Sequence, residues 1–525
     1  MNENQKTITL KQKAKESLKN KDYLAAHKAL LNILQIDQEY SDAFYLLAII
    51  PLESGNTDKA IELLNRAIAL ASQKVKYHVT LAKCFALKGD VIRTVESVEH
   101  AVGLGIENPI DFDTLGVAFS RIGLHEKALA FFKKAISENT GLANTYFNLG
   151  SCYKFLGFFS EAKNAYKKTL SMEPNHVKAL ASCVALGKLK DKSDYIKRLE
   201  SLIETTKNSD DILQLSHALA SIFESQNKYS SAFKILEKAK QKKICDLGYV
   251  FAEDKKMFDS LHKIFSDKNI DYHPGYRNDE AIFVVGMPRT GTTLVERMLS
   301  NHSDVSSVGE LHNFEVLLKQ MTNVSSQKLN IDSELLLATE IDFETLGKKY
   351  IESVQPLLGN GGRFVDKLPL NILFVGFIVK ALPNCKIICL DRNPLDTVVS
   401  NYRQIFSPKY AYCNYTNSLE SITEFYLSYK ALALFWHNLF PTNVCMVNYE
   451  ELVSNPKKKA EDFMLFCDLT WQPGCLNIED NKSPVATASA TQVRQPVQTK
   501  YIGTWCKYEE YLVEVKKKLA HAGAI

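Results

Sequence analysis

The chain has 525 residues, too many for one ordinary hydrophobic core, so we expect two or more domains. Its apolar content of 46% and charged content of 24% are typical of a globular protein in water. The net charge of +4 is small for this length, which argues against a nucleic-acid-binding protein but allows a local basic pocket.

The N-terminal residues 1–19 lack the apolar core that a signal peptide requires. No run approaches the roughly 18 apolar residues that cross a bilayer. The eleven cysteines are scattered without a C-x-x-C pair, which indicates reduced thiols rather than a disulfide framework. These features predict a cytoplasmic protein without a membrane segment.

A 34-residue period organises the first half of the chain. Glycines recur at this spacing, with small residues seven positions before each of them and, for the most part, five and twelve positions after. Small residues allow two helices to cross closely, and glycine suits the turn between them, so the pattern predicts helix–turn–helix units over about residues 7–245. The repeat glycines are Gly55, Gly89, Gly123 and Gly157.

This pattern resembles the tetratricopeptide repeat. Such repeats stack into a curved solenoid whose concave face often binds an extended peptide. A peptide ligand in the groove and a scaffold or dimerisation arm without one are equally good interpretations of the sequence. The predicted domains are a repeat solenoid at 1–245, a linker at 246–278 and a second domain at 279–525.

The second domain alternates between β-branched runs and helical patterns. Strands are expected at 282–286, 363–367, 386–390 and 443–448, and helices at 294–302, 370–382 and 397–406. This alternation predicts a parallel sheet with helices on both faces, so the fold class of the chain is α followed by α/β. Ligands of such sheets bind at the carboxyl ends of the strands.

The stretch GMPRTGTT, from Gly286 to Thr293, follows the first of these strands and begins a helix. It is similar to the nucleotide-binding pattern G-x-x-x-x-G-K-[ST], but Thr292 occupies the lysine position. Backbone N–H groups at a helix N-terminus, two hydroxyls and the Arg289 guanidinium suit a phosphate or sulfate group. Without the lysine, a triphosphate with its metal fits poorly, and a phosphosulfate needs less positive charge.

Two motifs resemble those of sulfotransferases that use 3′-phosphoadenosine 5′-phosphosulfate (PAPS). PRTGTT is similar to their 5′-phosphosulfate loop, and DRNPLDTVVSNY at 391–402 is similar to their 3′-phosphate motif. Joined to the repeats, the chain resembles the bacterial tetratricopeptide-repeat sulfotransferases, with a catalytic domain similar to protein-tyrosine sulfotransferases. The cofactor-binding residues that the resemblance implies are Pro288, Arg289, Thr290, Gly291, Thr292, Thr293, Arg392, Ser400, Tyr449, Arg494 and Lys500.

The resemblance also implies catalytic residues. Glu310, in a Gly-Glu pair, would accept the proton of the attacking hydroxyl, and Lys367 would neutralise charge on the leaving oxygen. Ser489 would donate to the bridging oxygen, and Arg289 would act beside these three residues. Histidine serves as the base in other branches of the superfamily, so His302 and His312 are rivals to Glu310.

One position departs from the tyrosine sulfotransferases. Thr504 stands where they have a lysine before a tryptophan, here Trp505. Arg494, Lys500 or Lys507 would then supply the charge for the 3′-phosphate. The family chemistry requires no metal, and the sequence contains no His/Cys cluster for one.

The expected reaction is transfer of the sulfuryl group from PAPS to a hydroxyl or phenol, with adenosine 3′,5′-bisphosphate as the product. A peptide tyrosine, a glycan and a small hydroxy metabolite are all open as acceptors. One alternative is a peptide-binding scaffold whose nucleotide-binding domain is inactive. Another is a nucleotide kinase, against which Thr292 argues.

Overall fold

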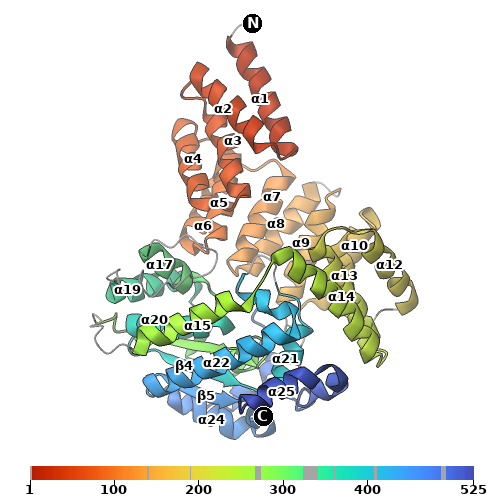
Figure 1. The fold of residues 1–525 in the computed structure, drawn as a ribbon. Helices are drawn as coiled ribbons and strands as arrows, with labels where there is room; N and C mark the ends of the chain where they lie inside the picture. Colours follow the sequence, from red (N-terminus) through yellow and green to blue (C-terminus); the bar gives the residue numbers. More distant parts are fainter. Residues whose placement is uncertain are drawn as a thin grey trace. The chain divides into compact units, whose positions relative to one another are not determined.

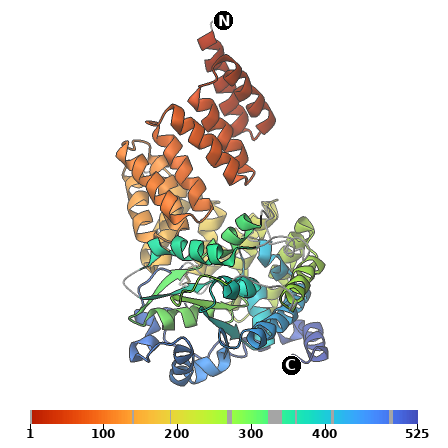
Figure 2. The same cartoon turned by 90° about the vertical axis from the view of Figure 1, so that its left-hand side faces the viewer.

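The computed structural model describes residues 3–138, 141–187, 189, 191–266, 274–322, 341–358, 362–406, 411–485 and 492–525. These residues form a long series of helices followed by a five-stranded parallel sheet with its own helices (Figures 1 and 2). The chain divides into two compact units, Met1–Cys152 and Tyr153–Ile525. The expected fold class is confirmed.

The first unit consists of antiparallel helix pairs. Helix α1 packs on α2, α3 on α4, α5 on α6 and α7 on α8, and α9 begins at the end of this unit. The bounds are α1 Glu3–Lys19, α2 Tyr23–Ile36, α3 Ser41–Glu53, α4 Thr57–Leu70, α5 Val75–Leu87, α6 Val91–Gly103, α7 Pro109–Arg121, α8 His125–Glu138 and α9 Ala143–Leu156.

The periodic small residues lie where the sequence pattern expects them. The four repeat glycines have φ between +71° and +86°, a conformation that residues with a side chain rarely adopt. The alanines and threonines that follow these glycines in the repeat are fully buried between the helices, at Ala60, Thr94, Ala128, Ala162, Ala67, Ala101, Ala135 and Thr169. Close helix crossing therefore explains the 34-residue period.

The second unit begins with helices that continue the repeat half. Their bounds are α10 Phe159–Met172, α11 Val177–Ala185, α12 Lys192–Thr205, α13 Ser209–Glu224, α14 Tyr229–Leu247 and α15 Phe251–Ser266. Helix α15 lies within the expected linker at 246–278. It packs along α22 (Leu419–Leu439), and its Phe258 and Phe265 belong to the apolar core of the sheet (Figure 1). Residues 251–266 are thus part of the folded unit rather than a spacer, because their apolar face is buried.

The sheet has the strand order β2-β3-β1-β4-β5, and every pairing is parallel. The strands are β1 Ala281–Gly286, β2 Val305–Gly309, β3 Arg363–Lys367, β4 Lys386–Asp391 and β5 Val444–Asn448. Four of them coincide closely with the runs expected from sequence. The edge strand β2 was not expected, because VSSVG contains only two large apolar residues and is half exposed.

Helices cover both faces of the sheet, as the expected parallel sheet requires. Successive side chains of β1 point to opposite faces of the sheet. Phe283 and Val285 lie in one apolar core, and Ile282 and Val284 lie in the other. The first core contains α15, α19, α20, α21, α22 and α25, and the second contains α16, α23 and α24. Being buried on both faces, β1 is an unbroken apolar run.

The remaining helices of this unit connect the strands. They are α16 Thr292–Ser300, α17 Asn313–Met321, α19 Phe343–Val354, η1 Gln355–Leu357, η2 Pro369–Phe374, α20 Val375–Ala381, α21 Pro394–Tyr402, η3 Ala411–Asn417, α23 Tyr449–Ser454, α24 Pro456–Phe466, η4 Pro473–Leu476, η5 Ile478–Asp480, η6 Thr504–Tyr511 and α25 Val513–His521. The helix expected at 370–382 is divided between η2 and α20.

Gly116 in α7 provides a test of the close helix crossing. A Cβ there would lie 2.6 Å from Cε1 of Phe132, whose ring is buried in α8, whereas a Cβ at Gly103 in α6 would meet open space. We expect Gly103→Ala to stabilise the protein by roughly 0.5–1 kcal/mol, the usual gain for alanine over glycine in a helix. Gly116→Ala should lack that gain, and overpacking should lower the free energy of unfolding by about 1–3 kcal/mol. Urea unfolding followed by circular dichroism measures both, and equal midpoints would contradict close crossing at Gly116.

Candidate functional site

The loop between β1 and α16 is held in a fixed shape by its own residues. Gly291 precedes α16 with φ of +104°, and a Cβ there would lie 2.6 Å from the ring of Tyr449, so only glycine fits beneath that ring. The Thr290 hydroxyl donates to the Met287 carbonyl at 2.7 Å and closes the turn. The loop is therefore preorganised before any ligand arrives.

The N-terminus of α16 has hydrogen-bond donors that no described residue uses. Gly291 provides no side-chain cap to the first turn of the helix. The side chains of Thr292 and Thr293 are nearly buried, yet their hydroxyls form no hydrogen bond with any residue that the structure describes. Backbone N–H groups and two hydroxyls at a helix N-terminus suit an anionic oxygen.

Arg289 lies in the loop with a left-handed backbone, at φ of +70°. The residue is half-buried, and its guanidinium donates to Oε1 of Gln492 at 3.0 Å. Burial lowers the pKa of Arg289 to about 10, and the nearby positive charges of Arg392 and Arg403 act in the same direction. This concentration of positive charge would be relieved by an anion.

Arg392 follows β4 and reaches the same loop. Its guanidinium donates to the carbonyls of Arg289 at 2.8 Å and Tyr501 at 2.5 Å, and it lies 4.7 Å from the centre of the Tyr449 ring. Only 6% of the Arg392 surface is exposed, and its Nε has no hydrogen-bond partner among the described residues. A buried donor without a partner is costly, and this nitrogen has the capacity to donate one further hydrogen bond.

Helix α21 connects Arg392 to the phosphate loop and to the C-terminal segment. Its Asn401 donates to the Pro288 carbonyl at 2.8 Å. The fully buried Asp396 accepts from N–H of Gly503 at 2.7 Å and N–H of Trp505 at 3.0 Å. Ser400, one turn further on, is half-buried, and its hydroxyl forms no hydrogen bond with the described residues.

Thr504 has a structural role at its divergent position. Its hydroxyl donates to Oδ1 of Asp396 at 2.9 Å, so a threonine there completes the hydrogen bonds of a buried carboxylate. Oδ2 of the same carboxylate lies 3.8 Å from the Arg392 guanidinium. Asp396 therefore couples the segment around Trp505 to Arg392.

The three basic residues expected to replace the lysine have other contacts. Arg494 donates to the Phe155 carbonyl at 3.2 Å, in the last turn of α9. Lys500 donates to Oε1 of Gln495 at 3.2 Å and lies over the ring of Tyr501, and Lys507 lies 5.2 Å from the centre of the Tyr229 ring. None of these contacts involves Arg392, which makes the three residues weaker candidates for a phosphate ligand than Arg392 itself.

Lys367 and Glu310 form an ion pair at the carboxyl ends of β3 and β2. Lys367 is 1% exposed, while the Glu310 side chain is 36% exposed and so remains accessible to an incoming group. Glu296 of α16 lies 3.7 Å from the same ammonium and accepts from Ser307 at 2.7 Å. Burial alone would lower the pKa of Lys367, but the two carboxylates raise it above its ordinary value, so this lysine is charged.

The two rival histidines lie in different settings. His302 is buried, its Nδ1 accepts from the Asp304 N–H at 3.1 Å, and its Nε2 lies 2.8 Å from the Thr470 carbonyl. Both ring nitrogens are therefore engaged in structure. His312 is half exposed and lies 3.7 Å from Glu315.

Ser489 lies outside the described residues. The described residues on either side of it are held in place. The Val485 N–H donates to the Phe155 carbonyl at 2.9 Å, and Gln492 accepts from Arg289. Arg297 of α16 further binds the carbonyls of Ser483 and Pro484.

The repeat half of the second unit contacts α21 directly. Glu224, the last residue of α13, binds the Arg403 guanidinium through both carboxylate oxygens, and it also accepts from the Tyr508 hydroxyl. Such bidentate pairs are among the stronger charged hydrogen bonds in proteins. Because Arg403 directly follows α21, this pair fixes the helix that carries Ser400 and Asn401.

Several residues of the site were not predicted from sequence. Glu296, Asp396, Arg297 and Glu224 all belong to ordinary helical patterns, and their partners are distant in the chain. Asp366 was also missed, although a carboxylate within an apolar strand is a recognisable signal. It is fully buried and accepts from the Tyr350 hydroxyl at 2.6 Å.

The described residues contain no group of three or more His, Cys, Asp or Glu side chains that could hold a metal ion. Within the same ranges, no helix has the length and apolar character needed to cross a membrane.

Comparisons with known proteins divide the chain in the same way as its motifs. A model of the sulfotransferase family matches residues 281–473. Models of the tetratricopeptide repeat match residues 17–84 and 143–176. Both resemblances noted from the sequence are thereby confirmed at the level of the families.

Individual relatives are distant. An uncharacterized protein of Aquifex aeolicus is 30% identical over 371 residues, which are 69% of this chain and 48% of that protein. A protein-tyrosine sulfotransferase of Drosophila melanogaster is 25% identical over 270 residues, 47% of this chain and 50% of the relative. The chain thus spans about half the length of these two relatives.

Among solved structures, the sulfotransferase domain of the Synechococcus PCC 7002 olefin synthase is 18% identical. The match covers 45% of this chain and 91% of that domain, with a TM-score of 0.33. A likeness at this level supports no argument about this chain.

Asp366 makes the stability of the protein dependent on pH. Burial raises its pKa to about 7, and the Tyr350 hydrogen bond opposes this only in part. Between the unfolded pKa of about 4 and this value the folded state binds more protons, so the free energy of unfolding should fall as pH rises from 4 to 7. We expect Asp366→Asn to flatten that part of the profile of melting temperature against pH. The exposed Asp279→Asn should leave the profile unchanged, and parallel profiles for the wild type and Asp366→Asn would contradict the raised pKa.

Proposed function

Because the chain joins tetratricopeptide repeats to a domain of the sulfotransferase family, we propose that it transfers the sulfuryl group of PAPS to an acceptor hydroxyl or phenol. One observation carries this proposal. The ion pair of buried Lys367 with accessible Glu310 lies next to α16, whose N-terminus has unused donors for an anion.

The residues of the site fit a phosphosulfate donor that also bears a 3′-phosphate. The N-terminus of α16, with Thr292 and Thr293, would hold the 5′-phosphosulfate, and Arg289 would add charge. Arg392, with its unpaired buried Nε, and Ser400 would hold the 3′-phosphate. The donor supplies an activated sulfuryl group and a phosphate leaving group. No metal ion enters this proposal.

Glu310 is the proposed general base. Its carboxylate is accessible, and the ion pair with Lys367 orients it at the carboxyl end of the sheet. A carboxylate in this position would accept the proton of the acceptor oxygen as that oxygen attacks. Of the two rival histidines, His302 lacks a ring nitrogen that is unengaged, which also favours Glu310.

Lys367 is the proposed electrostatic stabiliser. Its ammonium is buried between Glu310 and Glu296, where the low dielectric makes a positive charge effective. It would hold that charge where negative charge develops on the leaving oxygen. Ser489 remains a proposed donor to the same oxygen, from the family resemblance alone.

The acceptor is proposed to be a peptide tyrosine. One relative of this chain, from Drosophila melanogaster, is a protein-tyrosine sulfotransferase, which supports this acceptor. Tetratricopeptide repeats also commonly bind peptides. A glycan and a small hydroxy metabolite are the alternative acceptors. A cytoplasmic location stays a prediction from the sequence.

A transfer assay tests the proposed reaction. Labelled PAPS should be offered with a tyrosine-peptide pool, a glycan pool and a set of small phenols in separate reactions. We expect transfer to peptides, and we expect Glu310→Gln to lower kcat by about 10²–10⁴ because the proton acceptor is lost. The matched control is Glu344→Gln, an exposed position of the same unit.

The other outcomes of this assay are equally informative. Transfer to glycans or phenols alone would reassign the acceptor. Nucleotide binding without transfer to any pool would contradict the enzyme and favour the repeat scaffold with an inactive domain. Unchanged kcat in Glu310→Gln would remove Glu310 from the proposed mechanism.

Nucleotide binding tests the proposed donor separately. We expect the wild type to bind adenosine 3′,5′-bisphosphate more tightly than ATP with Mg²⁺ in calorimetric titrations. Arg392→Met should weaken binding of the bisphosphate by about 10- to 100-fold, the range for a lost charged hydrogen bond. Arg392→Lys keeps the charge without the planar guanidinium, so its affinity for the bisphosphate should lie between those of the wild type and Arg392→Met. The exposed Arg277→Met is the control. Tighter binding of ATP would favour a nucleotide kinase instead.

A further inference from the structure

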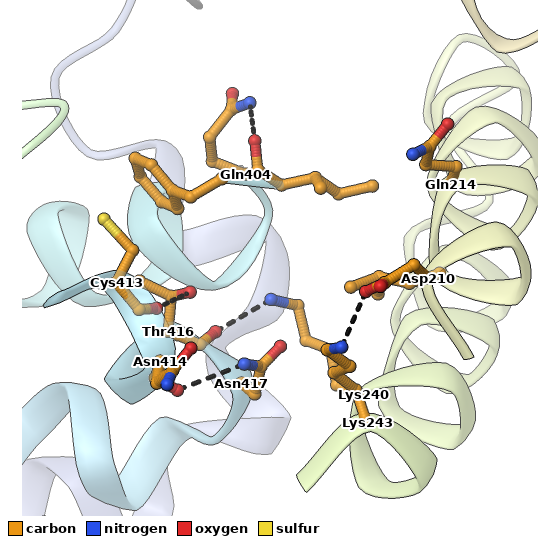
Figure 3. A pocket seen from close by; sticks show the side chains of 12 residues that line it. Asp210, Gln214, Lys240, Lys243, Gln404, Cys413, Asn414, Thr416 and Asn417 are labelled. Carbon is orange, nitrogen blue, oxygen red and sulfur yellow. Dashed lines mark hydrogen bonds and ion pairs between the residues drawn. The ribbon is translucent and has the colours of Figure 1, made fainter. Parts of the chain in front are cut away.

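A polar pocket lies between the repeat helices of the second unit and the segment after α21. Figure 3 shows Asp210 and Gln214 on one wall, Gln404 above, and on the opposite wall Cys413, Asn414, Thr416 and Asn417. The hollow has a volume of about 430 Å³, including the part open to solvent. None of its lining residues belongs to the proposed transfer site.

Lys240 of α14 is the unusual member of this lining. It is 1% exposed, and its ammonium donates to the Thr416 carbonyl at 2.7 Å and lies 5.0 Å from the centre of the Tyr402 ring. No carboxylate among the described residues forms an ion pair with it. Burial lowers the pKa of Lys240 to about 7, as expected for a charge without a counter-ion.

The second lysine of the pocket is already neutralised. Lys243 pairs with Asp210 at 2.7 Å, whereas the Lys240 amine reaches toward Thr416 on the opposite wall in Figure 3. The charged lining residues are therefore Lys240, Lys243 and Asp210, so their formal sum is one positive charge when both lysines are protonated. A ligand with a single negative charge would balance it.

The rest of the lining indicates what else such a ligand contains. Amide side chains line the same hollow, among them Gln214 and Asn417, and amides donate readily to a carboxylate. Leu213, Ile405 and Phe406 add apolar surface to the same hollow. A carboxylate joined to a small apolar body matches this combination.

We propose that this pocket binds a small monocarboxylic acid with an apolar body, whose carboxylate pairs with Lys240. The site does not depend on the proposed transfer reaction. Gln404 of the pocket follows Arg403, which Glu224 ties to α13, so the ligand would lie against the same junction of repeat helix and α21. A ligand would supply the counter-ion that the fold omits.

The test compares carboxylates with their neutral amides on the full-length protein. Benzoate against benzamide, and propionate against propionamide, should be titrated at constant ionic strength by ligand-observed NMR. We expect each carboxylate to bind at least about tenfold more tightly than its amide, the effect of one charged hydrogen bond. Lys240→Met should remove this preference, and the double variant Lys243→Met/Asp210→Asn, which removes a neutral ion pair and leaves the pocket with one net positive charge, should keep it.

Several results would overturn the site. Equal affinity for carboxylates and amides on the wild type would do so without any variant, which keeps the test valid if Lys240→Met does not fold. If a folded Lys240→Met protein still binds carboxylates more tightly than amides, the carboxylate binds at another site. If inorganic sulfate binds more tightly than benzoate, the pocket is a site for inorganic oxyanions rather than for a monocarboxylic acid.

Discussion

Positive charge is buried at the carboxyl edge of the sheet, where carboxylates lie beside both Lys367 and Arg392. Withdrawing an ion from water costs several kcal/mol unless partners replace the lost hydration. Arg392 is held by backbone carbonyls and an aromatic ring, and Lys367 by Glu310 and Glu296. The hydrogen bonds that remain unmade, at Nε of Arg392 and at the start of α16, are the ones that an anionic donor would make. The local folding of the loop, α21 and the segment around Trp505 all serves to hold these charges.

The repeat half also contributes to that arrangement. Glu224 binds Arg403 at the end of α21, and α15 fills the core under the sheet. The later repeat helices are therefore part of the folded unit that contains the site, whereas the helices before residue 153 form a unit of their own. A boundary drawn at residue 245 from the loss of periodicity separates helices that pack together. The expected domain ranges remain a prediction, since periodicity reports helix pairing and not the extent of a core.

Much of the fold was accessible to sequence reasoning because its signals are local. A glycine that must adopt positive φ, or a strand buried on both faces, leaves its mark within a few residues. Of the site, Arg289 stood out from the loop pattern itself, whereas Glu310, Lys367 and Arg392 came from the family resemblance. Glu296, Asp396 and Glu224 were not accessible, since each looks like a solvated helical carboxylate until its distant partner is known.

The sequence by itself determined the repeat period, the strand–loop–helix around Gly291 and the order of the motifs along the chain. These are set by backbone sterics and by the alternation of apolar residues, which act over short range. Only the tertiary structure decided that Lys367 pairs with Glu310, that Thr504 completes the hydrogen bonds of Asp396, and that Lys240 is buried without a carboxylate. Each of these depends on which strands and helices become neighbours, and burial then gives such long-range charge pairs their strength.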